Sequence, residues 1–242
     1  MASLGNVRKN IADQLALINL TYREAEIEAQ FIMQYVLKQS SAYLILNQHQ
    51  KISEHSVKQI SNIVSKRKKG IPLAYIIKEW DFYGHTFLVT KDTLIPRQDT
   101  ELLIDIILKK YKKDLSLNIL DLGTGSGIIG ITLARNFKKS EILMTDLSVN
   151  AIKVAKKNID ASGLKNIKCL QSNWFEKIDH SMFDIIVSNP PYIPKNDPHL
   201  ESPELKYQPQ MALTADDDGF SDIDNITFHA QKFLKKSGIL LI

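Results

Sequence analysis

Short apolar runs alternate with segments of helical periodicity from Ser116 onward, and this alternation narrows the possible folds more than any other feature. Strands are predicted at residues 118–122, 141–145, 166–171, 183–188 and 238–242. Helices are predicted at residues 127–137, 148–162 and 223–234. Because strands that alternate with helices pair in parallel through right-handed crossovers, we expect an α/β fold with a doubly wound, mostly parallel sheet. Ligands of such a sheet bind beyond the carboxyl ends of its strands.

The N-terminal part of the chain contains no strand-like run, and we expect a small helical domain over residues 1–78. Apolar residues at four-residue spacing, Ile27, Phe31 and Tyr35, predict an amphipathic helix over residues 24–37, with Ile32 and Val36 beside them. A second helix is predicted to start at a Ser53 cap and to stop at Gly70.

An aromatic and β-branched run follows at residues 80–89, with a glycine in its middle. This pattern predicts a β-hairpin, and we expect a hairpin linker over residues 79–100. Thr100 is the expected cap of the next helix. The catalytic domain is then expected over residues 101–242.

Composition excludes several classes of protein. The chain has 242 residues, 44% of them hydrophobic, which suffices for one domain plus a smaller one, and its net charge of +4 does not argue for a nucleic-acid partner. The single cysteine, Cys169, excludes an internal disulfide, and we expect a buried thiol in a reducing compartment. The histidines show no metal-ligand spacing, so no metal is expected. Without a membrane-length apolar run or a signal peptide, a soluble cytoplasmic protein is expected.

A glycine-rich loop follows the first predicted strand and its acidic residue Asp121; it comprises Gly123, Thr124, Gly125, Ser126 and Gly127. Glycines let a ligand approach the backbone closely, and the next helix offers free N–H groups. The second strand ends at Asp146, whose carboxylate suits the two hydroxyls of a ribose. The spacing G-x-G-x-x-G is typical of dinucleotide binding, whereas G-x-G-x-G after an acidic residue suits S-adenosylmethionine with its positive sulfonium. The loop alone favours the methyl donor modestly and leaves the dinucleotide open.

The segment Asn189-Pro190-Pro191-Tyr192 leaves the fourth predicted strand, which should lie beside the first. Proline fixes its own φ and restricts the residue before it, so the backbones of Asn189 and Pro190 are held rigid. The Asn189 side-chain oxygen and the Pro190 carbonyl oxygen are then two fixed acceptors for a planar –NH2 group. As that nitrogen gains a methyl group it becomes positive, which strengthens both hydrogen bonds. Tyr192 is expected to pack on the flat face of the amide or base. This loop decides in favour of methyl transfer.

Five motifs, LIPRQDTE, ILDLGTGSG, SNWF, IVSNPPYIP and DPHLE, together resemble the release factor glutamine methyltransferase family (HemK/PrmC) over nearly the whole chain. The resemblance implies a class I S-adenosylmethionine-dependent, Rossmann-like catalytic domain behind a helical domain and a hairpin. It also implies methylation of the glutamine side-chain amide nitrogen in the Gly-Gly-Gln motif of class I peptide chain release factors.

The same resemblance implies roles for individual residues. Residues 123–127 would line the methionine part of the cofactor, Asp146 would hold its ribose, and Trp174 would lie beside its adenine. Residues 189–192 would hold the substrate glutamine, with Asn189 also contacting the cofactor. The catalytic residues would be Asn189, Pro190 and Tyr192. The helical domain would bind the release factor, and we expect a monomer that requires neither nucleic acid nor a membrane.

Two features depart from the family pattern. Gln98 stands where the family has proline, which bears on the order of the loop and not on the chemistry. The family's catalytic domain continues beyond GILLI, where this sequence stops, so we expect it to be part of a longer protein. Three alternatives remain open at this point: an N6-adenine or other exocyclic-amino nucleic-acid methyltransferase, a nicotinamide-dependent oxidoreductase, and a non-catalytic binding module.

Overall fold

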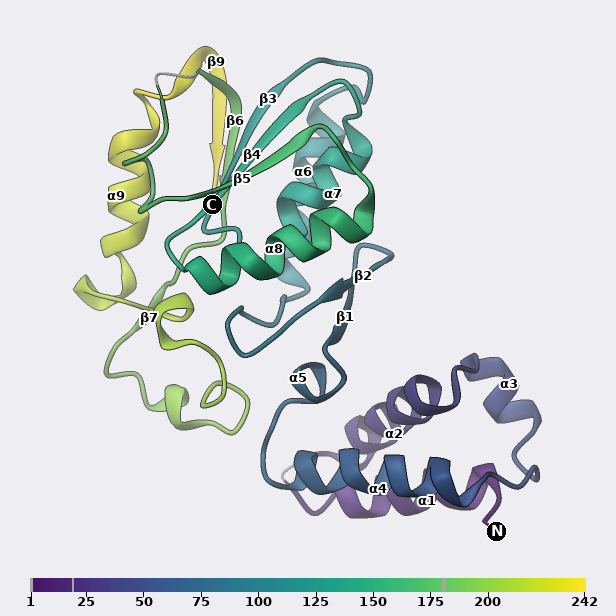
Figure 1. Cartoon of the computed structure of the whole chain (residues 1–242). Coiled ribbons are helices and arrows are strands. Elements are labelled where there is room, and N and C mark those ends of the chain that lie inside the picture. The colour runs from purple at the N-terminus through teal and green to yellow at the C-terminus, as the bar shows by residue number, and fades with distance from the viewer. Residues whose placement is uncertain (1, 19, 180–181) are drawn as a thin grey trace. The chain divides into compact units, whose positions relative to one another are not determined.

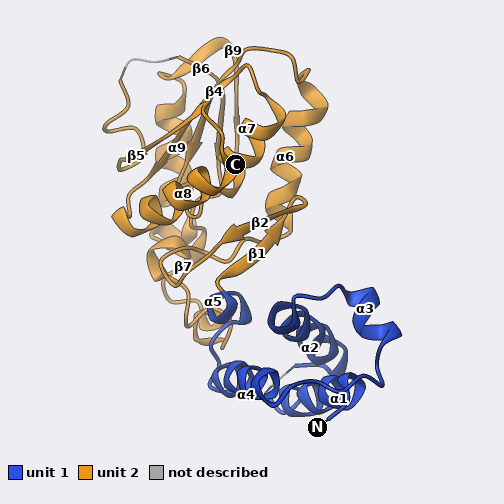
Figure 2. Cartoon of the chain, turned by 45° about the vertical axis from the view of Figure 1, so that its right-hand side comes forward, with its two compact units in different colours: residues 1–77 blue, residues 78–242 orange. Residues whose placement is uncertain are grey.

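The computed structural model of the chain describes residues 2–18, 20–179 and 182–242 (Figure 1). The chain forms two compact units, Met1–Ile77 and Lys78–Ile242 (Figure 2). The first unit is helical, and the second contains the hairpin and the large sheet. No helix in the described ranges combines the length and the apolar character needed to cross a bilayer.

The described residues of the first unit form five helices: α1 (Leu4–Leu15), α2 (Tyr22–Leu37), α3 (Ser41–Leu46), α4 (Glu54–Lys68) and α5 (Leu73–Ile77). Four of them begin where a hydroxyl side chain accepts a hydrogen bond from a free backbone N–H group; the caps are Ser3, Thr21, Ser40 and Ser53. The predicted helix that starts at Ser53 is confirmed. The sequence patterns did not predict α1, α3 or α5.

The predicted helix over residues 24–37 is confirmed as part of α2, but its buried face matches the predicted stripe only in part. Ile27 and Phe31 are each 48% exposed. The buried residues are Ala25, Ala29, Ile32 and Met33. Alanines allow close approach of α1, whose Ile11 joins the same hydrophobic cluster. Tyr35 of the stripe packs against this cluster, as does Val36 beside it, so only Ile27 and Phe31 lie away from the core. Because alanine contributes little to apolar periodicity, the sequence did not single out Ala25 and Ala29.

The predicted hairpin is confirmed in the second unit, where β1 (Glu79–Phe82) pairs antiparallel with β2 (His85–Leu88). Its two-residue turn has positive φ at Tyr83 (49°) and Gly84 (73°), as hairpin loops of this kind require. The rings of Phe82 and Phe87 are buried in the main hydrophobic core of the unit.

The next helix, α6 (Asp99–Lys110), corrects one expectation. Thr100 is not its cap, because Gln98 already has helical angles (φ −60°, ψ −36°) and no side chain caps the helix. Thr100 instead lies buried in the first turn.

A five-stranded parallel sheet in the order β5-β4-β3-β6-β9 forms the centre of the second unit. The strands are β3 (Asn118–Leu122), β4 (Glu141–Asp146), β5 (Ile167–Gln171), β6 (Phe183–Ser188) and β9 (Leu234–Leu241). The helices between them are α7 (Ile128–Asn136), α8 (Val149–Ser162) and α9 (Ser221–Ala230). The predicted parallel sheet and the pairing of the first with the fourth strand are confirmed. The chain changes direction across the sheet between β3 and β6, which creates a ligand crevice at their carboxyl ends.

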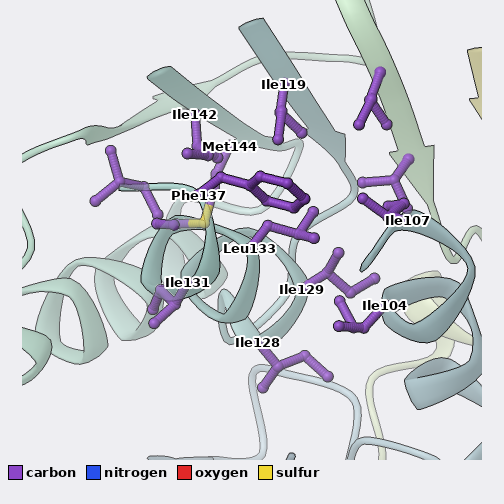
Figure 3. Close-up of a cluster of buried hydrophobic side chains, with 14 of the residues drawn as sticks. Ile104, Ile107, Ile119, Ile128, Ile129, Ile131, Leu133, Phe137, Ile142 and Met144 are labelled. Carbon is purple, nitrogen blue, oxygen red and sulfur yellow. The ribbon is translucent and has the colours of Figure 1, made fainter. Parts of the chain in front are cut away.

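Both faces of the sheet are buried. Figure 1 shows α6, α7 and α8 on one face and α9 on the other. Ile119 of β3 packs with Ile129 and Phe137 from the α7 side (Figure 3). Its neighbour Leu120 points to the opposite face and joins Ile226 of α9. Burial on both faces explains why the strands read as continuous apolar runs in the sequence.

The last helix and strand differ from the prediction. The helix α9 ends at Ala230 rather than at residue 234, and β9 starts at Leu234 rather than at Gly238. The pairing register of β6 with β9 shifts between Phe183 and Ile185. There a Cβ atom on Gly238 would lie 2.8 Å from the Phe183 carbonyl oxygen. Glycine therefore lets β9 continue past the irregularity and does not mark the start of the strand.

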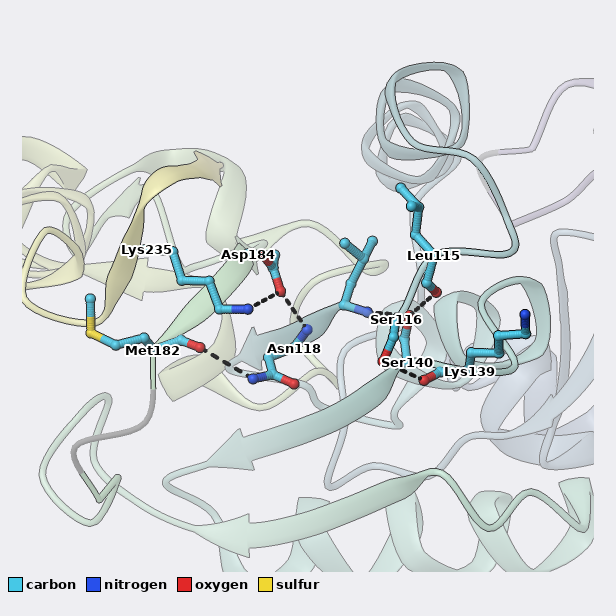
Figure 4. A network of polar contacts seen from close by, with 9 residues as sticks. Leu115, Ser116, Asn118, Lys139, Ser140, Met182, Asp184 and Lys235 are labelled. Atoms are coloured by element: carbon cyan, nitrogen blue, oxygen red, sulfur yellow. Dashed lines mark hydrogen bonds and ion pairs between the residues drawn. The ribbon is translucent and has the colours of Figure 1, made fainter.

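Polar contacts fix the strand starts at the amino edge of the sheet (Figure 4). Asp184 Oδ2 accepts a hydrogen bond from the Asn118 N–H at 2.7 Å and forms an ion pair with Lys235 Nζ at 2.7 Å. Beside it, the Ser140 hydroxyl accepts a hydrogen bond from the Leu117 N–H at 2.9 Å. These contacts tie together β3, β6 and β9, and the opposite ends of β3 and β6 carry loops of the site.

The remaining elements lie between β6 and α9 in the chain. The short strands β7 (Ile193–Pro194) and β8 (Thr214–Ala215) pair in parallel. Single turns of 3-10 helix occur at Pro198–Glu201, Gln210–Ala212 and Asp217–Gly219. On β5, Cys169 is half-buried rather than fully buried, and this burial raises the pKa of its thiol to about 12.

Candidate active site

The loop between β3 and α7 turns through three glycines with left-handed backbone. Their φ angles are 67° at Gly123, 58° at Gly125 and 87° at Gly127, a region that other residues enter only with strain. The Thr124 N–H donates to the Thr145 carbonyl oxygen at 2.8 Å and joins the loop to β4. Residues 123–126 line a cavity in the second unit, here called the main cavity.

Gly127 and Asp121 lie beneath this loop and are not among the residues that line the main cavity. A Cβ on Gly127 would be 3.1 Å from Ile131 Cδ1, so this glycine allows close packing of α7. Asp121 is fully buried and accepts hydrogen bonds from the Gly130 N–H at 2.9 Å and the Thr124 hydroxyl at 2.5 Å. Burial raises the pKa of its carboxyl to about 7. Asp121 therefore shapes the loop instead of facing a positively charged ligand.

Asp146 at the end of β4 lines the main cavity, as the sequence suggested. Its two oxygens accept hydrogen bonds from the backbone N–H groups of Gly125 and Ser148, both at 2.8 Å. Partial burial raises the pKa of the carboxyl, against the lowering effect of these bonds. The carboxylate is thus fixed in orientation, and each oxygen keeps acceptor capacity for a hydroxyl group.

Trp174 also lines the main cavity, on the side of Gly123. A Cβ on Gly123 would lie 3.4 Å from the Trp174 ring. The backbone of Trp174 has a positive φ of 44°. The indole Nε1–H donates to Asp222 Oδ1 at 3.2 Å, which holds the flat ring at the cavity wall.

The segment after β6 lies beside the glycine loop, because β6 pairs directly with β3 and Ser188 is the register partner of Leu122. The Ser188 hydroxyl donates to the Leu122 carbonyl oxygen at 2.9 Å and ties the end of β6 to β3. Asn189, Pro190 and Pro191 then line the main cavity. Tyr192 does not; it is 59% exposed and lines a second cavity.

The two cavities share one wall. The second cavity is lined by Arg97, Tyr192 and neighbouring residues of α6 and the β7–β8 region. The residues common to both cavities are Leu94, Thr100, Asn189, Pro190, Pro191 and Ala212. Asn189 and Pro190 thus border both cavities.

The main cavity is acidic. Its lining in the described part of the chain includes Asp92, Asp146 and Asp222, and it includes no lysine, arginine or histidine. Such a lining suits a ligand with positive charge, whereas a dinucleotide brings a pyrophosphate that needs compensation. A helix N-terminus could offset part of the negative charge of a pyrophosphate, but the three carboxylates of the lining would repel it.

Sequence reasoning missed three residues that hold the site loops. Asn158 of α8 is buried. Its Nδ2 donates hydrogen bonds to the carbonyl oxygens of Leu88 at 2.9 Å and Ser126 at 2.8 Å. Its Oδ1 accepts a hydrogen bond from the Leu88 N–H at 2.8 Å. The only sequence signal is a polar residue on the apolar face of a predicted helix. Gln208, also buried, accepts from the Ile95 N–H at 3.0 Å.

Gly219 is the third, and it lies against residues 189–192, the loop that the sequence predicts to be catalytic and that is called the catalytic loop below. Its φ is 94°, and a Cβ there would overlap the Tyr192 carbonyl oxygen.

Within the described residues, no group of three or more histidine, cysteine, aspartate or glutamate side chains is arranged to hold a metal ion. His180, one of the histidines considered in the sequence, lies outside the described residues.

Comparison with known proteins defines the class. Residues 98–201 match the methyltransferase small domain family, and residues 7–77 match the PrmC N-terminal domain family. A solved methyltransferase from Pyrococcus furiosus shares the fold, with a TM-score of 0.50 and 19% identity over 73% of this chain and 78% of that one. The chain has the fold of a class I S-adenosylmethionine-dependent methyltransferase.

Closer relatives define the family. A release factor glutamine methyltransferase from Coxiella burnetii is 37% identical over 242 residues, which cover 100% of this chain and 86% of that protein. The chain belongs to the release factor glutamine methyltransferase (HemK/PrmC) family. A bifunctional methyltransferase from Rickettsia bellii is 36% identical over 245 residues, 90% of this chain and 44% of that protein. The chain thus spans about half the length of such bifunctional relatives. The family uses S-adenosylmethionine, so the nicotinamide alternative is wrong.

Proposed function

We propose that the chain methylates the side-chain amide nitrogen of the glutamine in the Gly-Gly-Gln motif of class I peptide chain release factors. The observation that carries this proposal is the wall shared by the two cavities, with Asn189 and Pro190 in it. A slender side chain such as glutamine, inserted from the second cavity, meets this wall with its terminal carboxamide. The family relationship supplies the identity of the substrate protein.

S-adenosylmethionine supplies an activated methyl group on a sulfonium that leaves as a neutral thioether. The residues of the main cavity fit this molecule on charge and shape. The acidic lining favours its positive sulfonium and amino groups. Gly123 and Gly125 offer backbone without side chains, Asp146 offers a fixed carboxylate for a ribose, and Trp174 offers a flat ring for an adenine. Asn189 borders the same space.

The catalytic contribution of the chain is orientation. The Asn189 Oδ1 and the Pro190 carbonyl oxygen accept the two hydrogens of the substrate –NH2 group and direct its nitrogen towards the main cavity. A neutral carboxamide nitrogen is a poor nucleophile, and it becomes positive as it forms the new bond to carbon. Both hydrogen bonds then become charge-assisted, so they stabilise the transition state more than the ground state. The proton leaves the nitrogen to water afterwards, so no side chain need act as a base first.

The other parts of the proposal concern the partner and the compartment. The first unit binds the release factor, which is consistent with the exposure of Ile27 and Phe31 on α2 and of Leu46 at the end of α3. The enzyme acts as a monomer and without nucleic acid. Release factors function in translation, which implies a cytoplasmic location.

The test uses S-adenosylmethionine with an isotopically labelled methyl group and a recombinant class I release factor. Label is expected in the tryptic peptide that contains Gly-Gly-Gln, as N-methylglutamine by mass spectrometry. A release factor with glutamate in place of that glutamine is the matched control and should remain unlabelled. Label in both proteins, in added RNA or DNA instead, or in none of them contradicts the proposal.

A further inference from the structure

Thr100, in the first turn of α6, contacts Asn189 of the catalytic loop, which lies 89 residues later in the chain. Its Oγ1 lies 3.3 Å from Asn189 Nδ2, which donates a hydrogen bond to it. Thr100 is buried and belongs to the wall that the two cavities share. Since it does not cap α6, this contact is the role that the structure gives to its hydroxyl.

The orientation of the Asn189 carboxamide decides whether the loop can hold a substrate. An asparagine side chain offers an oxygen that accepts and an –NH2 group that donates, and a half-turn about its last bond exchanges the two. If the Asn189 –NH2 group were directed at the substrate nitrogen, its hydrogens would face the hydrogens of the substrate –NH2 group, and no hydrogen bond could form. With its Nδ2 held by Thr100, Asn189 keeps Oδ1 for the substrate.

The hydroxyl of Thr100 sits on a fixed frame. Threonine is branched at Cβ, so its χ1 angle has few options in a helix. Ahead of α6, the Ile95 N–H donates to Gln208 Oε1 at 3.0 Å. One residue after Thr100, Glu101 Oε1 accepts a hydrogen bond from the Tyr83 N–H of the hairpin turn at 2.9 Å. The start of α6 is thereby attached both to the segment after the catalytic loop and to the hairpin.

We propose that Thr100 is a positioning residue that sets the Asn189 carboxamide in the orientation needed to bind the substrate amide. This inference rests on the proposed glutamine methylation for its kinetic consequence, but the Thr100–Asn189 contact itself can be tested without any substrate. It also gives a reason for the buried threonine in the first turn of α6, a helix whose start no side chain caps.

The kinetic test compares Thr100→Val, which keeps the shape and removes the hydroxyl, with Thr100→Ser, which restores it. With release factor as substrate, Thr100→Val should lower kcat about tenfold, the upper range for one neutral hydrogen bond, and Thr100→Ser should recover most of it. The Kd for S-adenosylmethionine by calorimetry should stay within about twofold of the wild type. Thr132→Val is the matched control, because Thr132 on α7 is a buried threonine whose hydroxyl has no hydrogen-bond partner in the described structure.

Three kinetic results overturn the proposal: an unchanged kcat in Thr100→Val, an equal loss in Thr100→Ser, or a matching loss of cofactor affinity. The first shows that the hydroxyl is not needed, the second indicates packing, and the third places Thr100 with the cofactor. Thr132→Val should behave as the wild type in all three measurements.

A second measurement separates this proposal from the proposed function. The Asn189 side-chain amide resonances, identified by their absence in Asn189→Ala, should shift clearly in Thr100→Val and only slightly in Thr132→Val. A wild-type protein that leaves release factor unmethylated contradicts the proposed function, while the resonances still report on the contact. Asn189 resonances that are identical in wild type and Thr100→Val overturn the positioning role.

Discussion

Asn158 joins the hairpin to the glycine loop, so its replacement by leucine should destabilise the second unit. Leucine has a similar branched shape but cannot form the three hydrogen bonds to Leu88 and Ser126, which measure 2.8 to 2.9 Å. At about 1 kcal/mol of net stability for each bond, the free energy of unfolding should fall by about 3 kcal/mol. For a unit of this size, that corresponds to a decrease in Tm of about 6 to 12 °C.

Thermal unfolding followed by tryptophan fluorescence measures this effect in the right unit, because both tryptophans, Trp80 and Trp174, lie in Lys78–Ile242. Asn150→Leu is the matched control on the same helix; Asn150 is exposed, and its replacement should change Tm by less than about 2 °C. Cofactor affinity should also weaken in Asn158→Leu, since Ser126 borders the main cavity. Equal Tm values for the two variants would refute the bridging role of Asn158.

Two further predictions concern buried positions near the site. In Gly219→Ala the new Cβ overlaps the Tyr192 carbonyl oxygen at a φ of 94°, so the catalytic loop must shift. The kcat of Gly219→Ala should fall about 100-fold, with cofactor affinity nearly unchanged. The control is Gly163→Ala, which is also at positive φ but in open space and should keep the wild-type kcat. Equal kcat values in the two variants would argue against the role of Gly219 in supporting the loop. The Asp121 carboxyl has a folded-state pKa of about 7 against an ordinary 3.8, so the folded state binds a proton that the unfolded state releases between these values. The stability that this group contributes is present at low pH and is lost as the pH rises towards about 7. The Tm of Asp121→Asn should therefore rise relative to that of the wild type between pH 5 and pH 8. A Tm difference that does not change with pH would contradict the raised pKa of Asp121.

The sequence predicts those parts of the structure that are determined by neighbouring residues in the chain. Five strands and the helices between them follow from periodicity, and the crevice follows from parallel topology. The residues Gly123, Asp146 and Asn189 could be placed near one another because each ends or follows a strand at the same edge of the sheet. Their positions around the main cavity agree with that expectation, while their binding roles stay proposals.

Contacts between distant parts of the sequence could not be predicted in this way. Leu88 and Asn158 are 70 positions apart, Ile95 and Gln208 are 113 apart, and Thr100 and Asn189 are 89 apart. No local pattern distinguishes a buried asparagine that bridges two loops from an exposed one. The same limit applies to Gly238, where a close contact with another strand, and not the local sequence, decides what the glycine does.

The central claim is that Asn189 and Pro190 orient the substrate amide and contribute little to cofactor binding. The most direct test is the single-turnover rate of methyl transfer to release factor by Asn189→Ala at saturating S-adenosylmethionine, with the cofactor Kd measured on the same preparation. The rate should fall by about 100-fold or more, as when one preorganised hydrogen-bonding group is removed, and the Kd should change only a few-fold. A rate near that of the wild type, or a large loss of cofactor affinity that accounts for the whole effect, would contradict it.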